Sequence, residues 1–212
     1  MLSPAYLRTV PLPQDLTNDD IFTALVETES FFTSIRKNAG TNLSEIIQAN
    51  NFSGVVSNVF TKKLGDASIY QPYHDQRYPD LMHKAVPIGL EVKASNKPMK
   101  GGEGHNGHSG WHIVVCYHIL PIGDIEFTYV EIAELNGFGH PNSDWKYCGS
   151  KRNKNDSQRT ETYMTNSIGT AKLRDGSVYL NPEYVNITPH LRHRRKKSSD
   201  LLPIPSFSPF AG

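Results

Sequence analysis

The sequence predicts an α/β (α+β) protein with a central mixed β-sheet flanked by helices. Three observations support this class. Apolar residues recur at helical spacing over about 17–64, and they alternate with a period of two in several segments between about 68 and 135. A further helical stretch at 160–173 precedes a short strand at 178–180. Helices before and after a cluster of strands are typical of one mixed sheet covered by helices.

The first helix has clear signals at both ends. Thr17 is a suitable N-cap, and acidic residues follow it in the first turn. Apolar positions continue at helical spacing as far as Gly40, which is expected to end the helix. Two more helices are expected, at about 43–48 and 52–64.

The middle of the chain has the pattern of strands. Residues 88–95 alternate cleanly, and residues 111–120 are apolar enough for a buried strand. A turn at 121–124 connects the latter to another strand. Residues 136–158 are rich in Gly, Asn, Ser and Lys and predict a long loop. Strands are therefore expected at 68–73, 77–82, 88–95, 111–120, 125–135 and 178–180.

Composition excludes several classes of protein. With 37% hydrophobic and 10% aromatic residues among 212, the chain can bury a core, so global disorder is excluded. No apolar run reaches membrane-spanning length, and the N-terminus lacks the apolar stretch of a signal peptide. The two cysteines, Cys116 and Cys148, cannot build a disulfide scaffold. We therefore expect a cytoplasmic protein without a membrane partner.

Charge is distributed unevenly along the chain. The formal net charge is +1, but residues 151–197 hold eleven basic and four acidic residues, a balance of +7. Residues 1–150 hold eleven basic and sixteen acidic residues, a balance of −5. A basic C-terminal part suggests a polyanionic partner, although a solvated surface with a basic tail has the same composition.

The residues with the clearest chemical pattern are Asp80, Glu91 and Lys93. On a strand over 88–95, Glu91 and Lys93 point to one face of the sheet. Leu90 and Val92 both point to the other face, which suits a core. A hairpin-like return through Pro87 would bring Asp80 beside Glu91. Two converging carboxylates suit a hard divalent cation such as Mg²⁺, and Lys93 could orient a water molecule or stabilise developing negative charge. An ordinary surface Glu–Lys pair is the alternative.

The segments YPD at 78–80 and GLEVKAS at 89–95 resemble the PD-(D/E)XK nuclease superfamily, in particular type II restriction endonucleases. The resemblance covers the motif and the order of elements from about 41 to 173. It implies a restriction-endonuclease-like fold with a four- or five-stranded mixed sheet. It also implies Mg²⁺-dependent cleavage that leaves a 5′-phosphate, with Mn²⁺ as a substitute. Asp80 and Glu91 would then bind the metal, together with the backbone carbonyl of Val92, and Lys93 would be the catalytic lysine.

The same superfamily often adds an acidic residue from an upstream helix. Glu45 is the candidate here, and Glu27 and Glu29 are alternatives. Acidic residues are also common near exposed helix starts, which is the non-catalytic explanation of Glu45.

Histidines offer competing interpretations. His105, His108, His112 and Cys116 form H-x2-H-x3-H-x3-C, which suggests a zinc site, but the first two lie in a Gly-rich loop and the others are four apart on a strand. His105 with Asn106 superficially fits a histidine-based one-metal nuclease. That reading leaves Asp80, Glu91 and Lys93 unexplained.

Two loops are expected to contact DNA. The Gly-rich segment 101–110 follows the catalytic strand and allows close approach of its backbone to phosphates. The segment 145–159 is rich in side chains that read base edges and bind phosphates. A flexible connector and a solvated loop are the alternatives. The candidate DNA contacts are Ser95, Lys97, His105, Asn106, His108, Lys151, Arg152, Asn153, Lys154, Asn155 and Arg159.

Together these features predict a sequence-specific double-stranded DNA endonuclease of the restriction type, acting as a homodimer on a palindromic site. A repair or junction-resolving nuclease and a noncatalytic nucleic-acid-binding protein remain alternatives. We expect one catalytic domain over 1–212, with N-terminal helices at about 17–64, a catalytic sheet core at 68–135, a DNA-recognition loop and helix at 136–180, and a basic flexible tail at 190–212.

Overall fold

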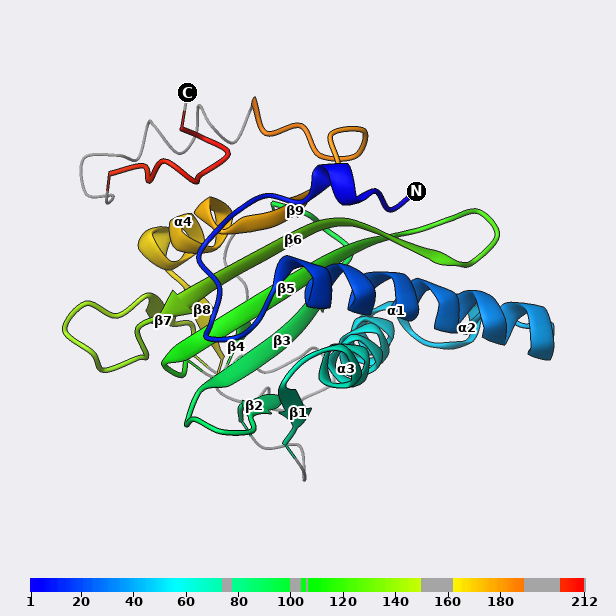
Figure 1. Ribbon diagram of the computed structural model, residues 1–212, viewed down its shortest axis with the longest axis horizontal. Coiled ribbons are helices and arrows are strands. Elements are labelled where there is room, and N and C mark those ends of the chain that lie inside the picture. The colour runs from blue at the N-terminus through cyan, green and yellow to red at the C-terminus, as the bar shows by residue number, and fades with distance from the viewer. Residues whose placement is uncertain (74–77, 100–103, 106, 150–161, 189–202, 212) are drawn as a thin grey trace.

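The computed structural model describes residues 1–73, 78–99, 104–105, 107–149, 162–188 and 203–211. They form a mixed α/β structure with a six-stranded mixed central sheet and four α-helices (Figure 1). The helices are α1 (Asn18–Ala39), α2 (Leu43–Ile46), α3 (Ala49–Ala67) and α4 (Ser167–Asp175), and a 3₁₀ helix, η1, covers Pro4–Tyr6. No helix of the described residues is long and apolar enough to cross a membrane.

The central sheet has the strand order β1-β2-β3-β5-β6-β9. The parallel pair β3–β5 lies at its centre, and the other neighbours are antiparallel. A second, three-stranded sheet has the order β4-β8-β7. The strands are β1 (Tyr70–Pro72), β2 (Leu81–His83), β3 (Gly89–Ser95), β4 (Gly104–His105), β5 (Gly110–Ile119), β6 (Ile125–Leu135), β7 (Trp145–Tyr147), β8 (Tyr163–Thr165) and β9 (Ser177–Leu180).

Helix α1 begins and ends as its sequence predicts. Thr17 and Asp20 form a capping box, in which each side chain accepts a hydrogen bond from the backbone N–H of the other. Gly40 ends the helix in the left-handed conformation, at φ 63°. Apolar residues at helical spacing then bury one side of α1 against the sheet.

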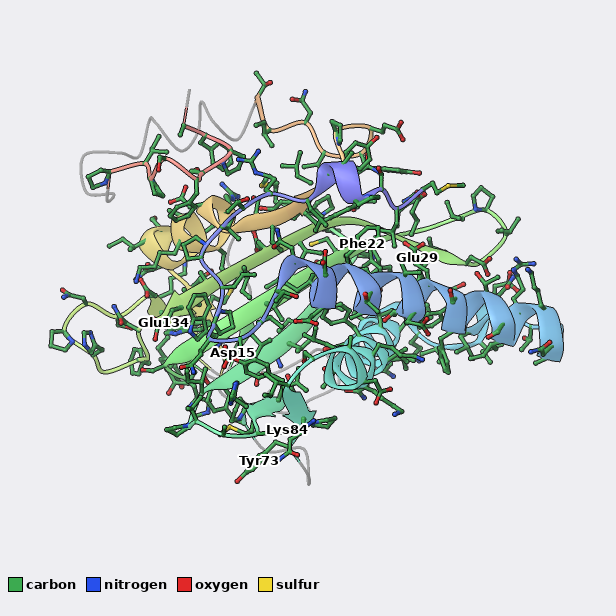
Figure 2. The ribbon with its side chains drawn as sticks, in the orientation of Figure 1. Asp15, Phe22, Glu29, Tyr73, Lys84 and Glu134 are labelled. Carbon is green, nitrogen blue, oxygen red and sulfur yellow. The ribbon has the colours of Figure 1, made fainter. Side chains whose placement is uncertain are left out.

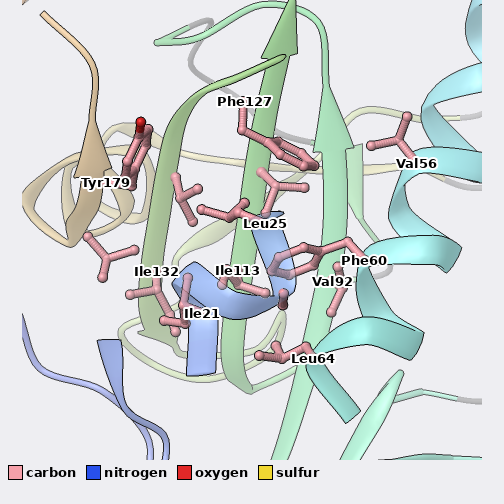
Figure 3. Close-up of a cluster of buried hydrophobic side chains, with 14 of the residues drawn as sticks. Ile21, Leu25, Val56, Phe60, Leu64, Val92, Ile113, Phe127, Ile132 and Tyr179 are labelled. Atoms are coloured by element: carbon pink, nitrogen blue, oxygen red, sulfur yellow. The ribbon is translucent and has the colours of Figure 1, made fainter. Parts of the chain in front are cut away.

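Helices α1 and α3 cover one face of the central sheet, and the main hydrophobic core lies between them and the strands. Leu25 and Phe60 from the helices pack there with Val92, Ile113 and Phe127 from β3, β5 and β6 (Figure 3). Side chains of alternate strand residues point to the opposite face. There a second cluster joins Val114 and Tyr129 to Leu173 of α4 and to Phe210.

Three expectations about the fold need correction. The helix expected at 160–173 is a strand, β8, followed by a helix that begins only at Ser167, where Asn166 caps it. The loop expected at 136–158 contains β7. The central sheet has six strands rather than four or five. The strands β7 and β8 have three residues each, too few for a periodic pattern, and they exist because they pair with each other.

The tail expected to be flexible over 190–212 is ordered in its last part. Phe210 is buried in the second cluster, and Ser208 donates a hydrogen bond to Asp175 Oδ1 at 2.7 Å. Arg8 also donates to the carbonyl of Phe207 at 3.2 Å. Buried aromatic surface and these contacts hold residues 203–211 against the domain; residues 189–202 lie outside the described part.

Glu29 is a half-buried acid on α1 (Figure 2), and its negative charge opposes folding. Its carboxylate accepts a hydrogen bond from the N–H of Phe127 at 2.8 Å, yet burial raises its pKa from 4.5 to about 7. The folded state therefore holds its proton more tightly than the unfolded state, so stability falls as pH rises from about 4.5 to about 7. Replacing the acid with a neutral acceptor should remove this loss.

We expect Glu29→Gln to raise the free energy of unfolding at pH 8 by about 1–2 kcal/mol and to leave it nearly unchanged at pH 4. Urea titrations at both pH values measure this difference. Glu27→Gln is the control, because Glu27 is exposed on the same helix. Equal stability of wild type and Glu29→Gln at pH 8 would contradict the assignment.

Candidate active site

The candidate site lies on the edge of β3 where β2 stops pairing with it. Within the described residues, the register of β2 with β3 covers Leu81 opposite Leu90 and Met82 opposite Gly89. Asp80 is the next residue outward, so it lies across from Glu91. The side chain of Asp80 replaces a backbone partner at this edge, because its Oδ2 accepts a hydrogen bond from the N–H of Val92 at 2.8 Å. A second bond, from the N–H of Tyr73 to the carbonyl of Asp80 at 2.9 Å, holds the backbone there.

Glu91 and Lys93 share the face of β3 that points away from α1 and α3. Leu90 and Val92 occupy the other face, in the main core. Glu91 is buried at 5% exposure, and its Oε1 lies 2.6 Å from Lys93 Nζ. Strand alternation thus keeps the ion pair out of the main core while burying the carboxylate.

Burial and two neighbouring charges act on the pKa of Glu91. Burial raises its pKa, the ammonium of Lys93 opposes this, and the nearby negative charge of Asp80 raises the pKa further. The backbone N–H of Asp80 also donates to the Glu91 carboxylate. The net effect is a pKa above the ordinary value. A cation that joined both carboxylates would relieve the repulsion between them.

The carbonyl of Val92 completes a set of oxygen atoms at this edge. The N–H and C=O of one strand residue point to the same side, so this carbonyl lies on the edge that Asp80 occupies. Ser57 of α3 donates a hydrogen bond to it at 3.1 Å, and a carbonyl oxygen has a second lone pair. Ser57 is a site neighbour that sequence reasoning missed, because the rotation of α3 over β3 has no signal in the sequence.

Tyr78 is the second neighbour that was missed. Its hydroxyl donates a hydrogen bond to the carbonyl of Ser109, and its ring lies 4.2 Å from that of His108. Burial, followed by the charges of Glu91 and Asp80, raises its pKa to about 12. Tyr78 therefore borders the two carboxylates as a neutral donor. Its place two residues before Asp80 is the signal that could have identified it.

The candidates for an upstream acid do not reach the carboxylate pair. Glu45 is on α2, where it accepts a hydrogen bond from Asn42 Nδ2 at 2.8 Å. The neighbouring Ser44 donates to the carbonyl of Gly123, in the turn that follows β5. That turn is at the far end of β5 from His112, the register partner of Glu91. The structure thus separates Glu45 from Asp80 and Glu91 by most of the length of the sheet.

The two alternatives to Glu45 have other partners. Glu27 forms an ion pair with Lys63 at 3.4 Å, and Glu29 accepts the N–H of Phe127. Both partnerships belong to the packing of α1 on its neighbours. Neither residue supplies a third carboxylate to the edge of β3.

The described histidine side chains do not assemble as a zinc site, and the side chain of His105 lies outside the described residues. His112 is buried, its Nδ1 lies 2.9 Å from the carbonyl of Gly110, and burial lowers its pKa to about 4, so it is neutral at pH 7. Cys116 belongs to the second hydrophobic cluster, and His108 packs on Tyr78. Within the described residues no group of three or more His, Cys, Asp or Glu side chains is placed to hold a metal ion.

The predicted DNA contacts have mixed outcomes. Ser95 is buried and forms a local turn with Lys97, which is exposed, and His108 is exposed beside Tyr78. His105 lies in β4, opposite Tyr163 of β8. The other candidates lie outside the described residues: Asn106, Lys151, Arg152, Asn153, Lys154, Asn155 and Arg159.

Comparison with known proteins found no relative of this chain. No protein-family model, no curated protein and no solved structure matches the chain.

Proposed function

We propose that this protein is a Mg²⁺-dependent endonuclease with a restriction-endonuclease-like fold, which hydrolyses phosphodiester bonds of double-stranded DNA at a specific sequence. The observation that carries the proposal is the position of Asp80 beside Glu91 at the edge of β3 where its pairing with β2 ends, with Lys93 Nζ 2.6 Å from Glu91 Oε1. Two carboxylates and a lysine in this arrangement are what metal-assisted phosphodiester hydrolysis needs.

The donor atoms at this edge suit a hard cation. The carboxylates of Asp80 and Glu91 and the carbonyl of Val92 are all oxygen ligands, which Mg²⁺ prefers, and Mn²⁺ accepts the same set. When bound, the ion would neutralise charge on the phosphate and lower the pKa of a bound water. We assign these three residues as its protein ligands.

The remaining groups have roles of their own. Lys93 supplies a fixed positive charge that orients the attacking water or stabilises the negative charge that develops on the phosphate. Asp80 is held by the N–H of Val92, so one of its oxygens is already oriented by the strand. Water attacks phosphorus and the bond to the 3′ oxygen breaks, which leaves a 5′-phosphate.

Cleavage of both strands at one site requires two such centres. A twofold homodimer would supply them, and its symmetry would match a palindromic sequence. A repair or junction-resolving nuclease would use the same metal site but would choose its substrate by shape. The two functions differ in the products that they make.

The test is digestion of supercoiled plasmid and of unmethylated phage DNA. We expect linear plasmid and discrete phage fragments with Mg²⁺ or Mn²⁺, and intact DNA with EDTA. Sequencing of the fragment ends reads the recognition site. Cleavage without discrete fragments would favour the structure-selective nuclease, and intact DNA with both ions would overturn the enzyme hypothesis.

A further inference from the structure

Three aromatic side chains form a partly exposed cluster: Tyr147 and Tyr163 on the small sheet and Phe138 in the segment between β6 and β7. We call these three residues the aromatic patch. Tyr147 and Tyr163 are register partners on β7 and β8, so their side chains point to the same side of the sheet. Their ring centroids are 5.3 Å apart, and the ring of Phe138 lies 4.8 Å from that of Tyr163. The three rings therefore form one continuous surface.

Two of the three rings of the aromatic patch are exposed to solvent. Phe138 is 53% exposed and Tyr147 47% exposed, whereas Tyr163 is half-buried. Tyr163 is pressed against Gly107, where a Cβ atom would come within 2.8 Å of the ring, and Gly107 has a φ of +75°. Because Gly107 has no Cβ, the Tyr163 side chain can lie close to the backbone at this position.

A short backbone segment, 107–109, connects the patch to the candidate active site. On the side of the patch, the N–H of Phe138 donates to the carbonyl of Gly107 at 2.7 Å. The indole of Trp145 donates to the carbonyl of His108 at 3.1 Å. On the side of the active site, Tyr78 donates to the carbonyl of Ser109 and lies beside the charges of Asp80 and Glu91. The patch is thus continuous with the site through hydrogen bonds.

From this continuity we infer that the aromatic patch binds an unpaired nucleobase of the DNA substrate by stacking. This inference rests on the proposed function, and it specifies the substrate. Exposed aromatic rings provide flat faces that stack on any base, whereas a paired base in a duplex offers only its edges in the grooves. An unpaired base, flipped from the duplex or already single-stranded, presents its face.

The experiment compares two fluorescent probes of about 16 nucleotides, a single-stranded oligothymidylate and an abasic chain with the same number of phosphates. Binding is measured by fluorescence anisotropy in EDTA, so that no cleavage is needed. We expect wild type to bind the thymidylate about 10-fold more tightly than the abasic chain. Phe138→Leu with Tyr147→Leu should abolish this preference and retain binding to the abasic chain.

The matched control is the exchange variant Phe138→Tyr with Tyr147→Phe, which keeps both rings and should keep the preference. Thermal unfolding followed by circular dichroism confirms that each variant folds. Equal binding of both probes by wild type, or a preference that survives the leucine variant, would overturn the inference. A patch that instead joins two subunits would show no base preference and a loss of dimer in the leucine variant.

The two proposals can fail separately. Base-dependent binding without any cleavage of DNA in Mg²⁺ or Mn²⁺ would refute the proposed function and leave the stacking site standing. Cleavage of plasmid by a protein that binds both probes equally would refute the stacking site alone.

Discussion

Asp80→Asn, Glu91→Gln and Lys93→Ala are each expected to reduce the rate of Mg²⁺-dependent plasmid cleavage by about 100- to 1,000-fold. The first two retain the shape of the side chain and remove a negative charge from the proposed metal ligands. The third removes the fixed cation 2.6 Å from Glu91. The measurement is the loss of supercoiled plasmid with time, at saturating Mg²⁺.

The matched control is another acid–lysine pair. Glu27 and Lys63 form an ion pair at 3.4 Å on the helices, and Glu27→Gln and Lys63→Ala should cleave at the wild-type rate. Lys93→Arg adds a finer test, because it keeps the charge but changes the geometry of the donors. Full activity of Asp80→Asn or Lys93→Ala would remove these residues from the active site.

Phe60→Ala is expected to lower the free energy of unfolding by about 3–5 kcal/mol, which is a large part of the stability of most domains. Phe60 is fully buried on α3, and its ring packs edge-on against Phe127 of β6, with centroids 6.1 Å apart. Phe60 lies between the helix and the sheet (Figure 3), so its replacement by alanine is expected to leave a cavity there. Urea unfolding measures the change from the shift in midpoint at constant slope.

Lys62→Ala is the control on the same helix, because Lys62 is exposed and its ion pair with Asp66 contributes little. A loss of less than about 1 kcal/mol in Phe60→Ala would mean that α3 is not packed on β6 as described. The variant also bears on the site, because Ser57 of the same helix holds the Val92 carbonyl. The rate of plasmid cleavage by Phe60→Ala should therefore be measured as well, at a temperature at which the variant is fully folded.

The core of the candidate site was predictable because its geometry is local. Glu91 and Lys93 share a face through the alternation of one strand, and this needs no knowledge of the rest of the fold. Asp80 reaches Glu91 through the antiparallel pair β2–β3, whose strands are only a few residues apart in sequence. Two strands joined by a short loop usually pair with each other, so this pairing could be expected from the sequence.

Other parts depended on distant contacts. Glu45 lies on a helix in the expected region, but the docking of α2 beside the turn at Gly123 carries it away from β3. Strands β7 and β8 consist of three residues each and are stabilised by partners across the small sheet. Phe210 packs in a core cluster with residues from β5, β6, β7 and α4.

By itself, the sequence determined the α/β class, the boundaries of α1 and the acid–lysine pattern on β3, because helix caps and strand periodicity act over a few residues. Only the tertiary structure decided which helix lies over the site, how many strands the sheet has, and that the patch on β7 and β8 is joined to the site through residues 107–109. Those arrangements depend on side-chain packing and hydrogen bonds between segments far apart in the chain, which no local pattern encodes.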